Sequence, residues 1–583
     1  MSNLPERFRS STLPGLAQAF RRWVATLAEP GTVVVPGASE IERQRLAALG
    51  GLAASIAEGV RCDWDPVIRQ WASAGPTPPE EILDATRQAL GRDEDPLGAL
   101  YNACISGANR RRLGTVFTPP GLVEHMLQLV ERELSAPPSV VVDPGAGVGA
   151  FTIAAVETWP DAQIVASDIN PVTLGLLGAR LAFEIDADPD LADGYRSVDL
   201  RLGDYLDELE RMFAVAAPGP VLVLGNPPYT RMQELPATDR AKAARLAGDL
   251  IDSGHANLAM LFQAATLRLM RPQDVSCMVV PGSFSYTRAS RALRTAIWRS
   301  SRSVVVHRTP AVSHTFAGRS VQAAVLLIGR ERKRRGALRL GRIQVNGDGV
   351  DVLGSWKVAR TGAQPENWFW SSDESAGPMN GSLLLGDIAV IRRGTATGAN
   401  DMFFLTDLGR AMFPPDVVVA AIPTLRRFDC DDLTAATHAT HGDDATQRWL
   451  LAIPPERPLS GALFEYVERH RDTVSKRYLS RQRAVWYSIT ELPRPQVLIS
   501  PLSKTGFKVV LNTVRAVPSN NLFGISLRTD GDITPLVTWL RSQTGQRELS
   551  HASRRYPGGS HKLEPGDLRR LPLPAHVAAA LAS

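Results

Sequence analysis

A forced break in the backbone at Asn226-Pro227-Pro228-Tyr229 constrains this chain more than any other feature. The tetrapeptide follows an apolar run, Val221 to Leu224, whose length and composition predict a buried strand. Because two prolines in a row continue neither a helix nor a strand ladder, the chain must turn at the carboxyl end of that strand. In an open α/β sheet, ligands bind at that edge. The sequence therefore predicts a binding site around Asn226.

The groups in this turn suit a planar amine. Asn226 offers a side-chain amide oxygen and Pro227 a backbone carbonyl, which together can accept two N–H bonds. The ring of Tyr229 offers a face on which a flat ligand can stack. Such a tetrapeptide is also compatible with a plain proline-stiffened turn, so its interpretation depends on the segments that precede it.

A glycine-rich turn after an earlier strand supports the ligand site. The predicted strand, Val140 to Val142, ends in Asp143 and is followed by Pro144-Gly145-Ala146-Gly147-Val148-Gly149 and a helical run, Phe151 to Thr158. Glycines allow the backbone to approach a ligand closely, and the helix N-terminus directs N–H groups at it. The spacing differs from the dinucleotide-binding G-x-G-x-x-G pattern, and the leading acid suits an ammonium group better than a pyrophosphate.

Two further predicted strands also end in acidic residues. Ile164 to Ser167 leads to Asp168-Ile169, and an acid about twenty positions after the glycine turn is placed to accept hydrogen bonds from ribose hydroxyls. Asp199 to Leu202 leads through Gly203 to Asp204-Tyr205, where a carboxylate can accept from the amino group of an adenine ring. Each acid alone is also compatible with an ordinary helix cap. Suitable groups at successive strand ends favour a nucleoside site.

This order of motifs resembles that of S-adenosylmethionine-dependent N6-adenine DNA methyltransferases with the gamma arrangement. In that family the cofactor motifs precede the catalytic motif, and a target recognition domain lies at the C-terminus. Gly114 to Pro120 resembles the N-terminal cofactor motif, and Asn257-Leu258 to Phe262 resembles the helix after the catalytic motif. The resemblance covers residues 110–330 and, more weakly, the C-terminal half. It implies a class I methyltransferase α/β fold, with a Rossmann-like mixed sheet of seven strands.

The resemblance also implies roles for individual residues. The catalytic motif is Asn226, Pro227, Pro228 and Tyr229. The cofactor, S-adenosylmethionine, is expected to contact Thr118, Pro119, Asp143, Pro144, Gly145, Gly147, Asp168, Ile169, Asp204, Tyr205, Asn226 and Phe262. Tyr229 and Phe316 are expected to stack on the target base. Phe316 is also compatible with a core aromatic in a sheet hairpin.

These residue types suit methyl transfer to an adenine amine. The N6 lone pair is delocalised into the ring, so N6 becomes nucleophilic only when Asn226 Oδ1 and the Pro227 carbonyl accept its two hydrogens. Transfer is then direct, and orientation and electrostatics supply most of the acceleration. A base in a duplex must first be flipped out at a cost of a few kcal/mol, which stacking at about 1–3 kcal/mol per base can offset.

Four segments are expected along the chain. Residues 1–110 show apolar residues at helical spacing, 111–345 carry the methyltransferase motifs, 346–380 are expected to be a linker, and 381–583 an α+β target recognition domain. The run from Arg392 to Asn400 resembles the opening of such domains. The residues expected to contact DNA are Arg392, Arg393, Arg554, Arg555 and Lys562.

Composition fits a globular protein with a phosphate-backbone partner. The 583 residues are 44% hydrophobic and 21% charged, with a formal net charge of +5. The four cysteines form no C-x-x-C pair, so neither a structural metal nor a disulfide framework is expected. Neither a signal peptide nor a membrane span is evident, which favours the cytoplasm. No lysine precedes Lys242, which excludes the acid-x-Lys signature of common restriction nucleases from the N-terminal segment.

The expected function is therefore sequence-specific methylation of adenine N6 in double-stranded DNA. We expect the protein to be the modification component of a restriction-modification or related defence system, and the sequence leaves open whether a separately encoded cognate endonuclease is its partner. Two alternatives stay open. One is methylation of a protein glutamine amide or an RNA base, against which the large C-terminal segment argues. The other is a non-catalytic DNA-binding specificity protein, against which the complete set of motif residues argues.

Overall fold

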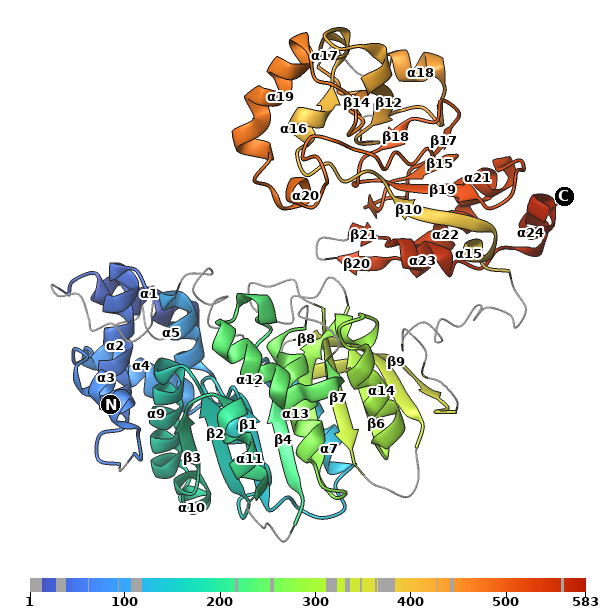
Figure 1. The fold of residues 1–583 in the computed structure, drawn as a ribbon. Coiled ribbons are helices and arrows are strands. Elements are labelled where there is room, and N and C mark those ends of the chain that lie inside the picture. Colours follow the sequence, from blue (N-terminus) through green and yellow to red (C-terminus); the bar gives the residue numbers. More distant parts are fainter. Residues whose placement is uncertain are drawn as a thin grey trace. The chain divides into compact units, whose positions relative to one another are not determined.

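The computed structural model divides into two compact units, Met1–Asp373 and Glu374–Ser583, which are described separately (Figure 1). The first unit carries the predicted ligand site, and the second carries the predicted DNA contacts. The residues described are 13–27, 38–60, 62–92, 94–105, 118–214, 219–251, 256–310, 322–330, 336–346, 349–361, 364, 368, 383–426, 428–440, 445–556 and 560–582.

Five helices near the N-terminus pack against the rest of the first unit. They are α1 (Leu13–Val24), α2 (Glu40–Ile56), α3 (Pro66–Ser73), α4 (Glu80–Leu90) and α5 (Pro96–Cys104). Ser39, Asp65 and Asp95 accept hydrogen bonds from first-turn N–H groups and so cap α2, α3 and α5. Helices α2, α3 and α4 contact α9 (Pro171–Ala187), beside which they lie in Figure 1. The expected N-terminal helical region therefore shares its core with the segment that carries the predicted ligand site.

Two glycines of α9 allow this packing. A Cβ atom at Gly175 would meet Trp71 Cζ3 at 2.4 Å, and one at Gly178 would meet Trp64 Nε1 at 1.9 Å. Trp71 Nε1 also donates to the Leu46 carbonyl at 2.9 Å, which fixes its indole ring between α2 and α9. The two indole rings consequently lie directly on the backbone of α9.

A mixed sheet with the strand order β3-β2-β1-β4-β5-β7-β6-β8-β9 forms the centre of the first unit. Strands β3, β2, β1, β4 and β5 are parallel, and β7 is antiparallel to both of its neighbours. The carboxyl ends of β1 to β4 therefore meet at one edge, where the strand order reverses beside β1. The strands are β1 (Val140–Pro144), β2 (Gln163–Asp168), β3 (Asp199–Leu202), β4 (Val221–Gly225), β5 (Val275–Pro281), β6 (Ser303–Arg308), β7 (Ala323–Gly329), β8 (Leu338–Asn346) and β9 (Gly349–Val358).

Helices cover both faces of this sheet, which explains its unbroken apolar strands. Val141 points into a core shared with α7, α8, α9 and the N-terminal helices, whereas Val140 and Val142 point into a core shared with α11 to α14. The helices not yet located are α7 (Pro120–Glu131), α8 (Ala150–Thr158), α10 (Ala192–Arg196), α11 (Tyr205–Ala214), α12 (Ala237–Ala247), α13 (Leu258–Leu269) and α14 (Arg291–Ser300).

The expected α/β class is confirmed, but the sheet is larger than the seven strands expected. Strands β8 and β9 pair antiparallel and extend the sheet beyond β6. The expected linker at 346–380 was therefore wrong over residues 349–358, which form β9. The residues of this edge strand are half-buried or exposed, so its sequence lacks the apolar run of a central strand.

The second unit is α+β, as expected, and contains three sheets. Their strand orders are β10-β19-β15-β17-β13, β11-β14-β12-β18 and β16-β21-β20. The strands are β10 (Ala389–Arg393), β11 (Phe404–Leu405), β12 (Val418–Ile422), β13 (Asp432–Leu433), β14 (Trp449–Leu451), β15 (Val497–Ile499), β16 (Leu502–Ser503), β17 (Val509–Asn512), β18 (Val517–Pro518), β19 (Phe523–Leu527), β20 (Arg554–Tyr556) and β21 (Ser560–Lys562). The helices are α15 (Leu385–Ile388), α16 (Asn400–Phe403), α17 (Asp407–Ala411), α18 (Ala435–Thr440), α19 (Gly461–Val474), α20 (Tyr478–Arg481), α21 (Thr534–Arg541), α22 (Gln543–Ala552), α23 (Pro565–Arg569) and α24 (Ala575–Ala582).

Among the residues whose positions are given above, no helix has the length and apolar character needed to cross a bilayer. The same residues contain no group of three or more His, Cys, Asp or Glu side chains placed to hold a metal ion.

Candidate active site

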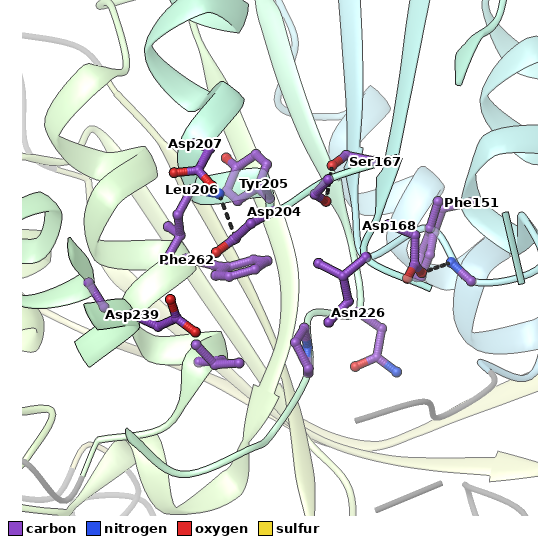
Figure 2. Close-up of a pocket in the computed structure, with 18 of the residues that line it drawn as sticks. Phe151, Ser167, Asp168, Asp204, Tyr205, Leu206, Asp207, Asn226, Asp239 and Phe262 are labelled. Carbon is purple, nitrogen blue, oxygen red and sulfur yellow. Dashed lines mark hydrogen bonds between the residues drawn. The ribbon is translucent and has the colours of Figure 1, made fainter. Parts of the chain in front are cut away.

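A cavity of about 340 Å³ opens at the carboxyl ends of β1 to β4 (Figure 2). Asp168 and Phe151 stand on one side of it, Asp204, Tyr205 and Phe262 on the other, and Asn226 between them. Its lining residues are Thr118, Gly145, Ala146, Gly147, Val148, Ala150, Phe151, Ser167, Asp168, Ile169, Gly203, Asp204, Tyr205, Leu206, Asp207, Asn226, Pro228, Leu235, Asp239, Lys242, Ala243, Leu258 and Phe262.

The glycine-rich turn after β1 brings backbone to the cavity wall. Gly145 has a φ of 78°, which favours glycine, and its N–H donates to the Ser167 carbonyl at 2.8 Å. A Cβ atom added at Gly145 would lie 3.5 Å from Pro228 Cδ and 3.9 Å from Pro227 Cα. The turn after β1 and the turn after β4 are therefore in direct contact.

Asp168 joins the glycine turn to the end of β2. Its Oδ2 accepts from the Gly147 N–H and its Oδ1 from the Asn170 N–H, both at 2.8 Å. Burial raises the pKa of Asp168, and hydrogen bonds from Asn170, Gly147 and Ile169 oppose that shift. Each carboxylate oxygen keeps a further lone pair that can accept from a ligand hydroxyl. The neighbouring Ile169 is 59% exposed, which leaves an apolar surface on the cavity wall for a ring to cover.

Asp143 lies behind the cavity rather than on its wall. Its side chain is buried, Oδ2 accepts from Thr152 Oγ1 at 2.7 Å, and Oδ1 has no hydrogen-bond partner within the described part of the chain. Burial is the main cause that raises the pKa of Asp143 to about 7, and the nearby charge of Asp168 adds to it. A buried carboxylate oxygen without a partner suits a cationic ligand group.

The turn after β4 holds Asn226 in a defined place. Asn226 Nδ2 donates to Thr118 Oγ1 at 3.1 Å, which connects the start of α7 to the end of β4. The next residues are fixed from the other side, because the Leu258 N–H donates to the Thr230 carbonyl at 2.9 Å. Asn257 caps α13 by accepting from the Met260 N–H at 3.0 Å.

Tyr229 packs against the two cores of the first unit and does not line the cavity. Its hydroxyl is buried with no hydrogen-bond partner among the residues described, and burial raises the pKa of the phenol. The contact of Tyr229 with a base stays a prediction, and its ring is not part of the wall of this cavity. Phe316, the other residue expected to contact a base, lies outside the described residues.

The structure adds a basic residue to the site. Lys242 Nζ lies 2.8 Å from Asp204 Oδ2 and 2.8 Å from Asp207 Oδ2. Lys242 is the first lysine of the chain and is not part of any motif found in the sequence. Only the position of α12 beside the cavity identifies it as a site residue. Asp204 Oδ1 also accepts from the Leu206 N–H at 2.9 Å. Both oxygens of the Asp204 carboxylate are thus engaged.

Most of the predicted cofactor contacts come together at this cavity. They are Thr118, Gly145, Gly147, Asp168, Ile169, Asp204, Tyr205, Asn226 and Phe262. The ring of Phe262 lies 4.8 Å from that of Tyr205, centroid to centroid. Pro119, Asp143, Pro144 and Pro227 lie next to lining residues but are not on the wall itself. The wall also contains Phe151, Leu206, Asp207, Leu235, Asp239 and Lys242, which the sequence did not predict.

Comparison with known proteins places both units in one group. The sequence profile described as "Eco57I restriction-modification methylase" matches residues 221–310, and that described as "Type II methyltransferase M.Eco57I, C-terminal domain" matches residues 379–582. The curated type II methyltransferase M.XamI of Xanthomonas campestris pv. amaranthicola is 26% identical over 490 residues, which cover 80% of this chain and 86% of the relative. The chain is thus similar in both units to Eco57I-type restriction-modification methyltransferases. The fold of the methyltransferase agrees with this similarity.

A solved structure shares its fold. The type IIL restriction-modification enzyme MmeI, in complex with DNA, is 13% identical to the methyltransferase with a TM-score of 0.51, and the match covers 96% of this chain and 81% of that one. The type IIG restriction endonuclease BpuSI is 15% identical with a TM-score of 0.43, covering 96% and 72%.

The basic residues expected to contact DNA lie in the second unit of the methyltransferase. Arg392 and Arg393 are exposed at the end of β10, where with Arg494 they line a cleft of about 190 Å³. Arg393 forms an ion pair with Glu564, and Lys562 Nζ lies 3.0 Å from the same carboxylate. Arg554 and Arg555 are on β20, which pairs with the strand that carries Lys562. The structure thus describes the side-chain surroundings of Arg392, Arg393 and Lys562. Arg393 and Lys562 share Glu564 as an acidic partner.

Proposed function

We propose that this methyltransferase transfers a methyl group from S-adenosylmethionine to N6 of an adenine flipped out of double-stranded DNA. The observation that carries the proposal is the cavity at the carboxyl ends of β1 to β4, which gathers Asp168, Asp204 and Asn226 around one space. Its volume of about 340 Å³ is in the usual range for small-molecule sites, about 300–1,000 Å³.

The residues present fit the proposed cofactor. Asp168 has lone pairs for ribose hydroxyls, Ile169 offers an uncovered apolar face for a purine, and Asp204 offers a carboxylate for an exocyclic amine. Behind the glycine turn, the unpartnered oxygen of Asp143 suits an amino-acid ammonium. When bound, S-adenosylmethionine supplies an electrophilic methyl group together with its leaving group.

The task left to the chain is to orient the target amine. Asn226 Oδ1 and the Pro227 carbonyl would each accept one N6–H, so the nitrogen lone pair is freed from the ring and directed at the methyl group. Thr118 holds the amide nitrogen of Asn226, which supports an orientation with the oxygen available for N6. Positioning of this kind needs no covalent intermediate with the protein.

The second unit supports duplex DNA as the substrate, because β10 exposes basic residues and one of them lies beside an aromatic ring. Arg393 lies over the Phe523 ring, 5.2 Å from its centroid, and Arg392 is exposed next to it. The similarity to Eco57I-type methylases and the DNA named for the MmeI structure favour the same substrate. We extend the proposal to modification of host DNA against a separately encoded endonuclease of the same specificity.

The test is a transfer assay with the purified protein, labelled S-adenosylmethionine and unmethylated duplex DNA, followed by nucleoside mass spectrometry. We expect the label in N6-methyladenine. The Asn226→Ala variant should lose activity by about 10²–10³-fold, the scale of a lost transition-state hydrogen bond, while it still binds the cofactor. Label in cytosine, in RNA or in a glutamine side chain would overturn the assignment, as would full activity of the variant.

A further inference from the structure

Lys242 occupies a position in the candidate active site that no motif explains. It lies on α12, which follows the Asn226 turn in sequence and packs against α13. Its side chain is only 22% exposed, although an isolated lysine would extend into water. Its ammonium group instead reaches the turn between β3 and α11, where Asp204 and Asp207 accept its two hydrogen bonds, each 2.8 Å long.

These bonds determine how the Asp204 carboxylate is presented. Oδ1 accepts from the Leu206 N–H at the start of α11, and Oδ2 accepts from Lys242. A carboxylate held at both oxygens has no freedom to rotate, yet Oδ2 keeps one lone pair. Partial burial opposes the charge of Lys242, but the hydrogen bonds to Asp204 and Asp207 outweigh it and raise the pKa of the ammonium.

Lys242 also offsets repulsion at this end of the cavity. Asp204, Asp207 and Asp239 all line the same wall, so three carboxylates lie near the place where a ligand must enter. Without a cation between them, Asp204 and Asp207 would repel each other and Asp204 would lose its fixed orientation. A neutral residue at position 242 would therefore change a carboxylate that itself faces the ligand.

We propose that Lys242 is a positioning residue that fixes Asp204 as the acceptor for the exocyclic amine of the cofactor's purine. Lys242 thereby sets the preference for a 6-amino purine over a 6-oxo purine in the methyl donor. The inference rests on the proposed function, because it takes S-adenosylmethionine as the cofactor. A 6-oxo group would face the fixed carboxylate with a lone pair instead of a hydrogen, which is unfavourable in a partly buried site.

The experiment compares two stable ligands, S-adenosylhomocysteine and its deaminated form S-inosylhomocysteine, by calorimetry with the full-length protein. The wild-type protein should bind the adenosyl ligand at least about tenfold more tightly, the size of one hydrogen bond to a charged group. Lys242→Met should reduce that ratio to about two or less, mainly by weakening the adenosyl ligand. Lys242→Arg, which keeps the charge, should recover part of the ratio.

Lys476→Met serves as the matched control, because it removes an exposed lysine from the second unit and should leave the ratio at its wild-type value. If Lys242 only held α12 in place, Lys242→Met would weaken both ligands equally and the ratio would stay, which would overturn the inference. An unchanged ratio with unchanged affinities would overturn it too. Failure of the wild-type protein to bind either ligand would instead contradict the proposed cofactor, so the two failures are distinguishable.

Discussion

Thr118 accepts a hydrogen bond from the side-chain nitrogen of Asn226 at 3.1 Å, across 108 positions of sequence. Thr118 immediately precedes the proline-capped start of α7, and Asn226 directly follows β4, so the bond joins the first segment of the cavity wall to the turn after β4. It also distinguishes the two ends of the amide. With the nitrogen committed to Thr118, the oxygen is the atom available to a ligand.

Removal of the Thr118 hydroxyl should therefore lower turnover more than it lowers cofactor affinity. In Thr118→Val the amide of Asn226 can rotate, and loss of one hydrogen bond worth about 1 kcal/mol should reduce kcat about fivefold. Thr118→Ser keeps the hydroxyl and should stay close to the wild type. Single-turnover rates with saturating DNA and calorimetric cofactor affinity measure the two effects; equal rates for the Val and Ser variants would contradict the role.

Removal of the buried charge of Asp143 should have opposite effects on the stability of the protein and on its affinity for the cofactor. Its pKa is raised to about 7 in the folded protein from an ordinary value of 3.8, so the folded state holds the proton more tightly than the unfolded chain. The stability contributed by the protonated form is present at low pH and is lost as pH rises through about 7. Asp143→Asn should therefore raise Tm at pH 8, and this gain should shrink as pH falls toward 4.

If Asp143 binds the ammonium group of the cofactor, Asp143→Asn should weaken cofactor binding even where it raises Tm. At pH 8 the Asn variant should bind S-adenosylmethionine more weakly than the wild type, and the two proteins should converge near pH 6 as the wild-type carboxylate takes up a proton. Differential scanning fluorimetry and calorimetry at the two pH values separate these effects. A pH-independent affinity difference would argue against the carboxylate's charge as the cause.

Glu564 restrains two of the expected DNA contacts. Burial acts to raise its pKa, but the hydrogen bond and charge of Lys562 and the charge of Arg393 lower it, so the carboxylate is ionised at neutral pH. Glu564→Gln should remove this acidic partner from Arg393 and Lys562, strengthen DNA binding several-fold at low salt, and steepen the salt dependence of log K by about one to two. Asp530→Asn, an exposed acid in the same unit, is the control for net charge. Equal effects of the two variants would show that only net charge matters.

Local sequence identified the strand ends because each strand is short and followed by a chain break. Asp168, Asp204 and Asn226 were found in this way, and the structure places all three around one cavity. Their convergence follows from parallel strands, whose carboxyl ends share an edge. The resemblance to a known family then supplied the roles that residue chemistry alone left open.

Features that depend on distant segments could not be found in this way. Lys242 has no motif of its own and reaches Asp204 only because α12 packs on α13. Asp143 and Tyr229 follow strand ends like the others, but Asp143 is buried behind the glycine turn and Tyr229 packs against the two cores, so neither lies on the cavity wall. Strand β9 was missed because its exposed and half-buried residues form no continuous apolar run.

The indole rings of Trp64 and Trp71, set against Gly178 and Gly175, tie the N-terminal helices to α9 so closely that the two cannot be treated as separable modules. A shortened enzyme that begins at residue 111 would expose the apolar surface of α9 to water and should precipitate when expressed. Anyone grafting a nuclease or an effector onto this protein should join it ahead of α1 and retain those helices, rather than substitute the new part for them.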